Sequence, residues 1–241
     1  MAERCVKVGC PEVLRLALQD PCTGEPIPGV GNGMVLRCTR NVTLEKVIRD
    51  PEISEFVSDC NIVDRYVQDA QLQGFNLSFE VASLSPQLEA LLNGDLLLAD
   101  TGTNVGVLYE ALQGCSQGSA DPRFIAELFY QVRQCDSSGA ASYVRYVVSG
   151  LRFQPSEMDK EGQIGIARFS GTSDPTLANG ITSINDGPYA DLPAAIVTDI
   201  NALPAGTSTF GFWFVDDTDP TAGVTLDANT CYAADVPVAA P

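Results

Sequence analysis

Histidine is absent from the 241 residues of this chain. Its absence excludes serine–histidine and cysteine–histidine nucleophile pairs, imidazole metal sites and the usual proton shuttle near neutral pH. Carboxylate, lysine or tyrosine chemistry would remain open to an enzyme, but no carboxylate pair stands out as an acid and a base. The sequence therefore predicts a protein that is not an enzyme.

Basic residues are scarce, with 14 lysines and arginines against 31 aspartates and glutamates, which gives a formal net charge of −17. Tight binding to DNA or RNA needs lysine and arginine side chains against the phosphates. The composition therefore argues against such binding. An acidic surface serves simple solubility, and it would also suit a conduit that must not grip the nucleic acid passing through it.

Long apolar runs are also lacking, because the leucines at 96–98 are bounded by Asp95 and Asp100. No apolar core follows the charged residues of the first positions, so no signal peptide is expected. No segment reaches the length that would span a membrane. The sequence predicts a protein made in the cytosol that does not insert into a membrane.

The eight cysteines include no Cys-x-x-Cys pair. Zinc bound by four thiolates usually shows two close pairs, and a disulfide scaffold needs a denser set of cysteines. The acidic run at 216–219 lacks the glycine and the distal glutamate of a helix–loop–helix calcium site. We therefore expect no metal and no cofactor, and we interpret the cysteines as buried free thiols.

The pattern of residues 73–94 predicts one strand followed by one short helix. Phe75, Leu77, Phe79 and Val81 alternate with small or polar residues, which is the period of a half-buried strand. A helix over 86–93 then starts with proline at its first position and carries three leucines on one face. A helix this short is stable only when that face packs on a sheet.

The rest of the chain reads mainly as antiparallel hairpins. Strands are expected at 12–19, where a helix is the alternative, and at 34–47, 124–134, 143–153, 163–169 and 209–215, with loops at 21–33 and 170–193. The predicted fold is one domain over residues 1–241, mainly β. It is an antiparallel β-sandwich or barrel-like sheet with one short flanking helix, and residues 224–241 form an extended C-terminal arm.

The segment from 49 to 72 is highly charged and too long for an ordinary connection. Two interpretations stay open: one more hairpin of the sheet, or a projecting hairpin or loop that docks on a neighbouring subunit. The candidate inter-subunit residues are Asp50, Glu52, Ile53, Phe56, Asp59, Asp64, Arg65 and Tyr66.

Three segments together resemble the major tail tube proteins of long-tailed bacteriophages. They are the strand and helix at 74–94, the strand at 142–155 that closes on proline, and SINDGPYADLP at 183–193. The last is similar to a loop in tail proteins of actinobacterial phages. The resemblance covers roughly residues 10–193, and it does not extend to the strand that carries Trp213.

This resemblance implies a structural virion protein of the tail, assembled in the host cytoplasm. Its subunits would form hexameric rings whose sheets join edge to edge around a lumen, and the rings would stack into a tube for DNA ejection. The implied partners are further copies of the chain, a tape-measure protein and a tail terminator, while DNA passes without tight binding. Glu80 and Glu127 are the candidate acids facing the lumen.

Two other classes of function remain open at this stage. One is a different virion part on a related fold, such as a tail terminator or a head–tail joining protein. The other is a secreted binding module with disulfides.

Overall fold

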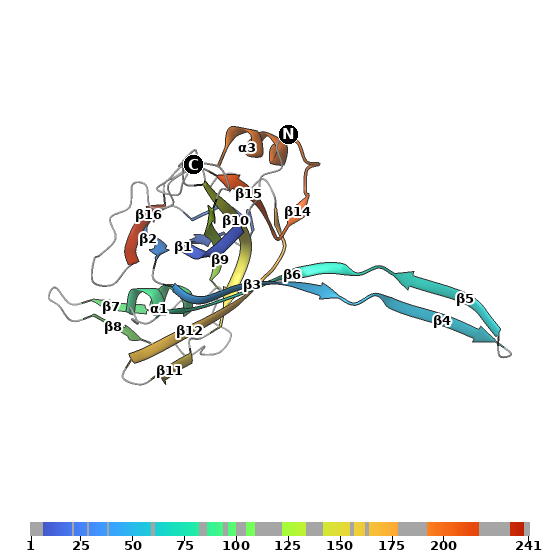
Figure 1. Ribbon diagram of the computed structural model, residues 1–241, viewed down its shortest axis with the longest axis horizontal. Helices are drawn as coiled ribbons and strands as arrows, with labels where there is room; N and C mark the ends of the chain where they lie inside the picture. Colours follow the sequence, from blue (N-terminus) through green and yellow to red (C-terminus); the bar gives the residue numbers. More distant parts are fainter. Residues whose placement is uncertain are drawn as a thin grey trace.

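The structure is a computed structural model, and it describes residues 7–20, 22–27, 29–37, 39–58, 61–81, 86–93, 96–99, 105–108, 122–133, 142–154, 157–161, 164–177, 192–216 and 232–238. Figure 1 labels the strands and helices of these residues. The strands are β1 (Lys7–Gln19), β2 (Gly29–Leu36), β3 (Thr39–Arg49), β4 (Glu52–Ser58), β5 (Asn61–Gln68), β6 (Gln71–Val81), β7 (Leu96–Ala99), β8 (Val105–Leu108), β9 (Arg123–Arg133), β10 (Ser142–Phe153), β11 (Glu157–Glu161), β12 (Ile164–Ser173), β13 (Thr176–Leu177), β14 (Ser208–Thr209), β15 (Gly211–Asp216) and β16 (Tyr232–Val238). The helices are α1 (Pro86–Asn93) and α3 (Ala194–Asn201).

Ten strands form one antiparallel sheet. Eight of them follow each other in the order β16-β2-β1-β9-β10-β12-β6-β3, while β11 pairs with β12 and β15 pairs with β10. The two ends of this path are not hydrogen-bonded to each other, so the sheet is open and not a closed barrel. The pairs β4–β5, β7–β8 and β13–β14 are separate two-stranded sheets.

Strand β10 joins the two halves of the large sheet. Strand β9 pairs along one edge of β10, from Ser142 to Leu151. Along the other edge, β15 pairs with the part from Tyr143 to Val148, and β12 pairs with the part from Leu151 to Phe153. The change of partner falls at Gly150, which has a φ of +68° and a backbone that any side chain would crowd. A bend of this kind lets one strand belong to both of two sheet layers that pack face to face.

The main core lies between these two halves. Leu14 and Leu16 of β1 meet Leu77 and Phe79 of β6 in one buried cluster. Two phenylalanines of this cluster, Phe79 and Phe169, stack with their ring centroids 5.3 Å apart. Helix α1 adds Leu88 and Leu92 to the same cluster. The leucine face predicted for the helix is therefore buried against the sheet, as part of the main core.

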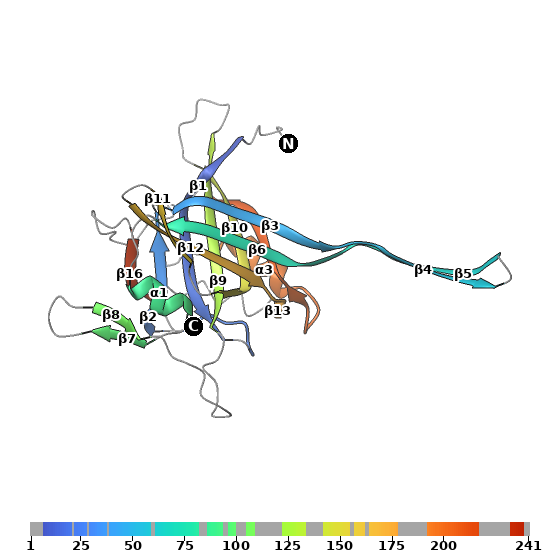
Figure 2. The same cartoon turned by 90° about the horizontal axis from the view of Figure 1, so that it is seen from below.

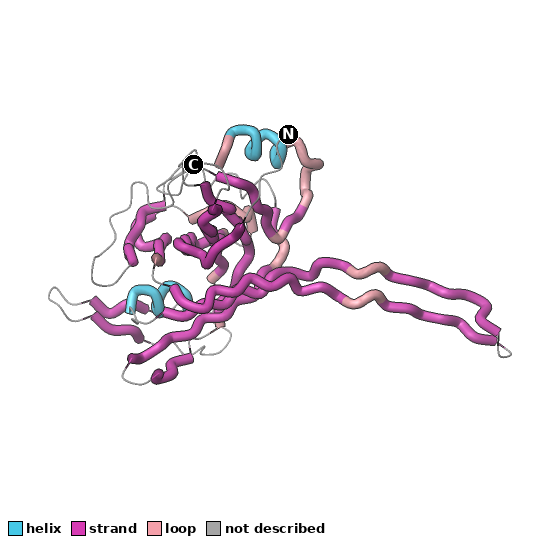
Figure 3. Tube along the Cα trace, viewed as in Figure 1, coloured by secondary structure: helices cyan, strands magenta, loops and turns pink. Residues whose placement is uncertain are grey.

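A second, smaller core lies on the face of β1, β9 and β10 that points away from the main core. Ala17, Ile125, Val147 and Phe214 form it together with Leu192, and α3 packs its Ile196 and Val197 against them. Helix α3 was not predicted from the sequence, because eight residues rich in β-branched side chains carry no clear helical signal. Figure 3 shows how little of the described chain is helix.

The predicted fold class is confirmed: the chain is mainly β and antiparallel, with a short helix packed on the sheet. Residues 12–19 are a strand and not a helix. The expected single strand at 34–47 is two strands, and β2 and β12 each extend into a segment expected to be loop. The predicted C-terminal arm contains β16, which pairs with β2.

Candidate functional site

Strands β4 and β5 form a two-stranded ribbon that projects from the body of the molecule (Figure 1). We call residues 50–70 the arm, which is distinct from the C-terminal segment at 224–241. Figures 1 and 2 both show it continuing the line of β3 and β6 beyond the rest of the sheet, at the end opposite the β7–β8 hairpin. No third strand or helix of the described chain covers it in either view.

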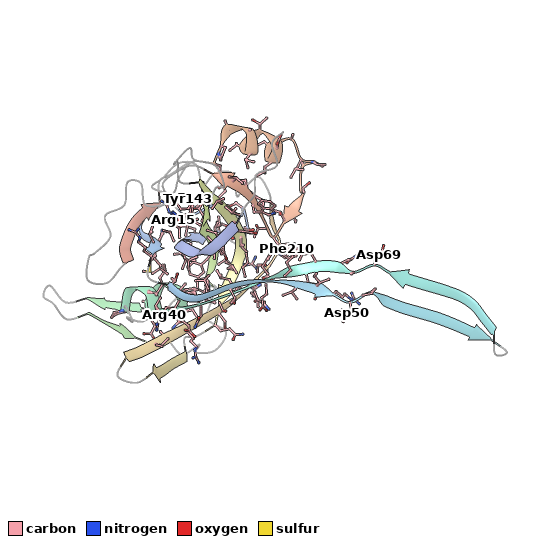
Figure 4. All side chains as sticks on the ribbon, viewed as in Figure 1. Arg15, Arg40, Asp50, Asp69, Tyr143 and Phe210 are labelled. Atoms are coloured by element: carbon pink, nitrogen blue, oxygen red, sulfur yellow. The ribbon has the colours of Figure 1, made fainter. Side chains whose placement is uncertain are left out.

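The base of the arm is exposed but firmly anchored. Asp50 and Asp69 lie where β3 and β6 give way to β4 and β5, partway along the projection (Figure 4), and both are exposed. On the body side, the backbone N–H of Phe75 donates a hydrogen bond of 2.7 Å to Ser173 Oγ. Gly74 packs so closely there that an added Cβ would lie 2.7 Å from the carbonyl oxygen of Ser173. The direction of the arm is therefore set by close backbone packing.

The two strands of the arm pair in antiparallel register. Ile53 lies opposite Val67, and Val57 lies opposite Ile62. Glu55 lies opposite Arg65 between these two pairs. The register shifts between Phe56 and Val57, so an irregularity interrupts the pairing of the two strands within the arm.

The residues proposed from the sequence as inter-subunit contacts fall on this arm. Asp50 is at its base, Glu52, Ile53 and Phe56 are in β4, and Asp64, Arg65 and Tyr66 are in β5. Asp59 lies outside the described residues.

A second feature is a polar outer face on β12, β6 and β3, opposite the main core. Three rows cross these strands in register: Arg168–Glu80–Arg40, Ser170–Ser78–Thr43 and Thr172–Asn76–Glu45. The hydroxyls of Thr43 and Ser78 are 2.7 Å apart and hydrogen-bonded. We call these nine residues the polar face, and none of them is apolar.

Glu80 sits at the centre of its row. Its Oε1 accepts a hydrogen bond of 2.8 Å from Arg168 Nε, and its Oε2 accepts one of 2.6 Å from Asn41 Nδ2. The bond from Arg168 is the main cause that lowers the pKa of the Glu80 carboxyl, and the bond from Asn41 adds to it. The carboxylate therefore stays charged and is held by two donors on the polar face.

Glu127 lies elsewhere, and this corrects the expectation that it faces a lumen. Its side chain is 2% exposed and forms an ion pair with Arg145, which is fully buried. It lies on β9, on the face that carries the smaller core, opposite Arg15 in register. A carboxylate enclosed in this way cannot meet DNA that passes the molecule.

The sequence analysis missed the buried charged cluster around Glu127. The guanidinium carbons of Arg15 and Arg145 each lie 5.3 Å from the centroid of the Phe129 ring, and Arg145 is equally close to Phe214. Each arginine interrupts a strongly apolar strand. That pattern, with a glutamate in the strand between them, is the signal that would have predicted a buried ion pair.

Neither described helix is long and apolar enough to cross a membrane. Within the described ranges, no three cysteine, aspartate or glutamate side chains lie close enough together to hold a metal ion. Most of the acidic run at 216–219 lies outside those ranges. A scan against models of known protein families finds no match for the chain, and a search of curated proteins finds no similar sequence.

Proposed function

We propose that this chain is a structural subunit of a bacteriophage tail tube, which assembles with copies of itself into stacked rings around a lumen for DNA. The observation that carries this proposal is the arm. It is a two-stranded ribbon that projects from the body, and no other strand or helix of the described chain covers it.

An isolated two-stranded ribbon is marginally stable in water. The arm contains apolar residues such as Ile53, Val57 and Val67, and burial of apolar side chains against another surface would stabilise it. A second copy of the chain is one such surface. An arm that inserts into a different site on the next copy makes a head-to-tail contact, and repetition of that contact builds rings or filaments.

The open sheet supports the same proposal. Strands β16 and β3 end the path of the sheet, and in the described residues no strand pairs along their outer edges. An exposed edge favours pairing with a strand of another chain, and such a contact between subunits covers the edge. The resemblance of residues 74–94 to tail tube proteins agrees with this mode of assembly.

The polar face is our candidate for the wall of the lumen. Its hydroxyl and amide side chains offer no apolar surface, and its central carboxylate is already held by Arg168 and Asn41. The net charge of −17 opposes close approach of phosphates. DNA would then pass without being gripped. The expected partners are other copies of this chain, a tape-measure protein and a tail terminator, in the tail of a virion assembled in the host cytoplasm.

The test is negative-stain electron microscopy of the purified chain over a concentration series, with mass photometry alongside. We expect rings or hollow tubes of uniform bore. In a matched variant, Asn-Gly replaces residues 50–70 and joins Arg49 directly to its register partner Gln71. This variant should keep the β-sheet circular dichroism of the intact chain but should not form rings.

Single rings that do not stack would favour a tail terminator over a tube subunit. A chain that stays monomeric at the highest concentration would contradict the proposal. Ring formation by the variant that lacks the arm would show that the arm does not carry assembly.

A further inference from the structure

Charge is unevenly distributed along the hairpin that contains the arm. Residues 37–49, which include β3, carry four basic residues and one acidic residue. The arm, residues 50–70, carries six acidic residues and one basic residue. The most basic stretch of an acidic chain therefore lies directly before its most acidic projection.

The basic residues of the first stretch are on the surface. Arg37, Arg40, Lys46 and Arg49 are all exposed. In the described residues β3 pairs with β6 alone, so its other edge has no strand bonded along it. An edge strand of this kind can accept a further strand through its backbone groups.

The arm cannot fill this edge in its own molecule. It continues the direction of β3 away from the body and does not fold back beside it (Figures 1 and 2). The close packing of Gly74 against Ser173 fixes that direction at the base. Any contact between the arm and a basic β3 therefore joins two copies of the chain.

We propose that the acidic arm of one copy docks along the basic edge strand β3 of the next copy. This inference rests on the proposed self-assembly and names the surface that receives the arm. The lengths are compatible: β3 has 11 residues and β4 has 7, which span about 37 Å and about 24 Å in extended conformation. The contact is heterologous, so it can close into a ring.

Nucleic acid is the competing occupant of a basic strand. The basic residues of 37–49 are few, and the rest of the chain is acidic. Nonspecific binding to DNA gains its affinity from many phosphate contacts and is opposed by a surrounding negative field. A short acidic ribbon of matching length fits the strand better than a long polyanion does.

The test is charge reversal in the full-length chain, with assembly measured as the critical concentration for ring formation. Lys46→Glu reverses one exposed charge at the middle of the basic strand. We expect it to raise the critical concentration by about fivefold, because the reversal removes a favourable surface interaction and replaces it with repulsion. The matched control is Ala195→Glu with Ala205→Glu, which makes the same change in net charge at exposed positions on and after α3 and should leave assembly unchanged.

A compensating exchange distinguishes pairing from damage to the fold. Glu52→Lys reverses one charge of the arm. Combined with Lys46→Glu, it keeps the net charge of the unchanged chain and should restore the critical concentration to within about threefold, since the exchanged charges attract as the original ones do. Such a rescue would not follow if Lys46→Glu merely destabilised the subunit.

The outcomes separate this inference from the proposed function. If the variant without the arm fails to assemble while Lys46→Glu assembles normally, the arm docks elsewhere and the inference is overturned, although the proposed function stands. If Lys46→Glu lowers the affinity of the chain for linear DNA but leaves assembly unchanged, the basic strand binds nucleic acid instead, and the inference is again overturned. A chain that never assembles overturns both.

Discussion

Glu127→Gln should destabilise this protein far more than a typical loss of one surface charge. Glu127 is 2% exposed and Arg145 is fully buried, and the two form an ion pair between β9 and β10. The glutamate also lies opposite the buried Arg15 in register. The substitution keeps the shape of the side chain but removes the negative charge that faces two buried guanidinium groups.

Removal of one partner from a buried ion pair costs about 3–5 kcal/mol, because the remaining charge stays out of water without its counter-charge. For a chain of this size, each kcal/mol lowers the melting temperature by about 2–4 °C. We therefore expect the melting temperature of Glu127→Gln to fall by about 6–20 °C.

The assay is thermal and urea unfolding followed by circular dichroism, with Glu80→Gln as the matched control. Glu80 is also ion-paired, but its side chain is 15% exposed and that of Arg168 is 51% exposed. An exposed pair contributes about 1 kcal/mol or less. Equal losses of stability in the two variants would refute the argument that burial of the Glu127–Arg145 pair determines its effect.

Three further outcomes are expected. Gly150→Ala should prevent the bend in β10 and reduce the yield of folded protein, because the new Cβ would lie 2.2 Å from the carbonyl oxygen of Asp174; limited proteolysis checks this, and wild-type resistance would contradict it. Phe79→Ala should cost about 3–5 kcal/mol in urea unfolding, since the ring is 1% exposed in the main core. Because its pKa is lowered in the folded chain, Glu80 stabilises the fold above its ordinary value of 4.5 and loses that effect as the pH falls through the folded value. The stability difference between wild type and Glu80→Gln should therefore shrink below pH 4.5, and a constant difference down to pH 2 would argue against this.

Several elements could be predicted from the sequence because their signals are local. Alternation in 75–81 and the leucine face of 86–93 mark β6 and α1 without any knowledge of the rest of the chain. The strong strands β9 and β10 were also found within one or two residues of their bounds. In each case the apolar side chains recur at the period of the element itself, which a window of about ten residues reveals.

Other elements depend on partners distant in the sequence. Strand β16 contains a proline and has weak strand signals, yet it pairs with β2, about two hundred residues earlier in the chain. Helix α3 is held by Ile125 and Phe214 of two separate strands. The acids Glu80 and Glu127 look equivalent in the sequence, since each follows an apolar residue within a strand.

The sequence by itself determined that this chain is mainly β, acidic and without histidine, and that residues 49–72 are too long and too charged for an ordinary connection. Composition and local periodicity carry those properties, and no distant contact is needed to read them. Only the tertiary structure decided that β3 and β6 send the arm away from the body, and that Glu127 is enclosed while Glu80 lies on the polar face. Burial and direction are set by which strands pair and how the sheet folds over itself, and those contacts join residues far apart in the chain.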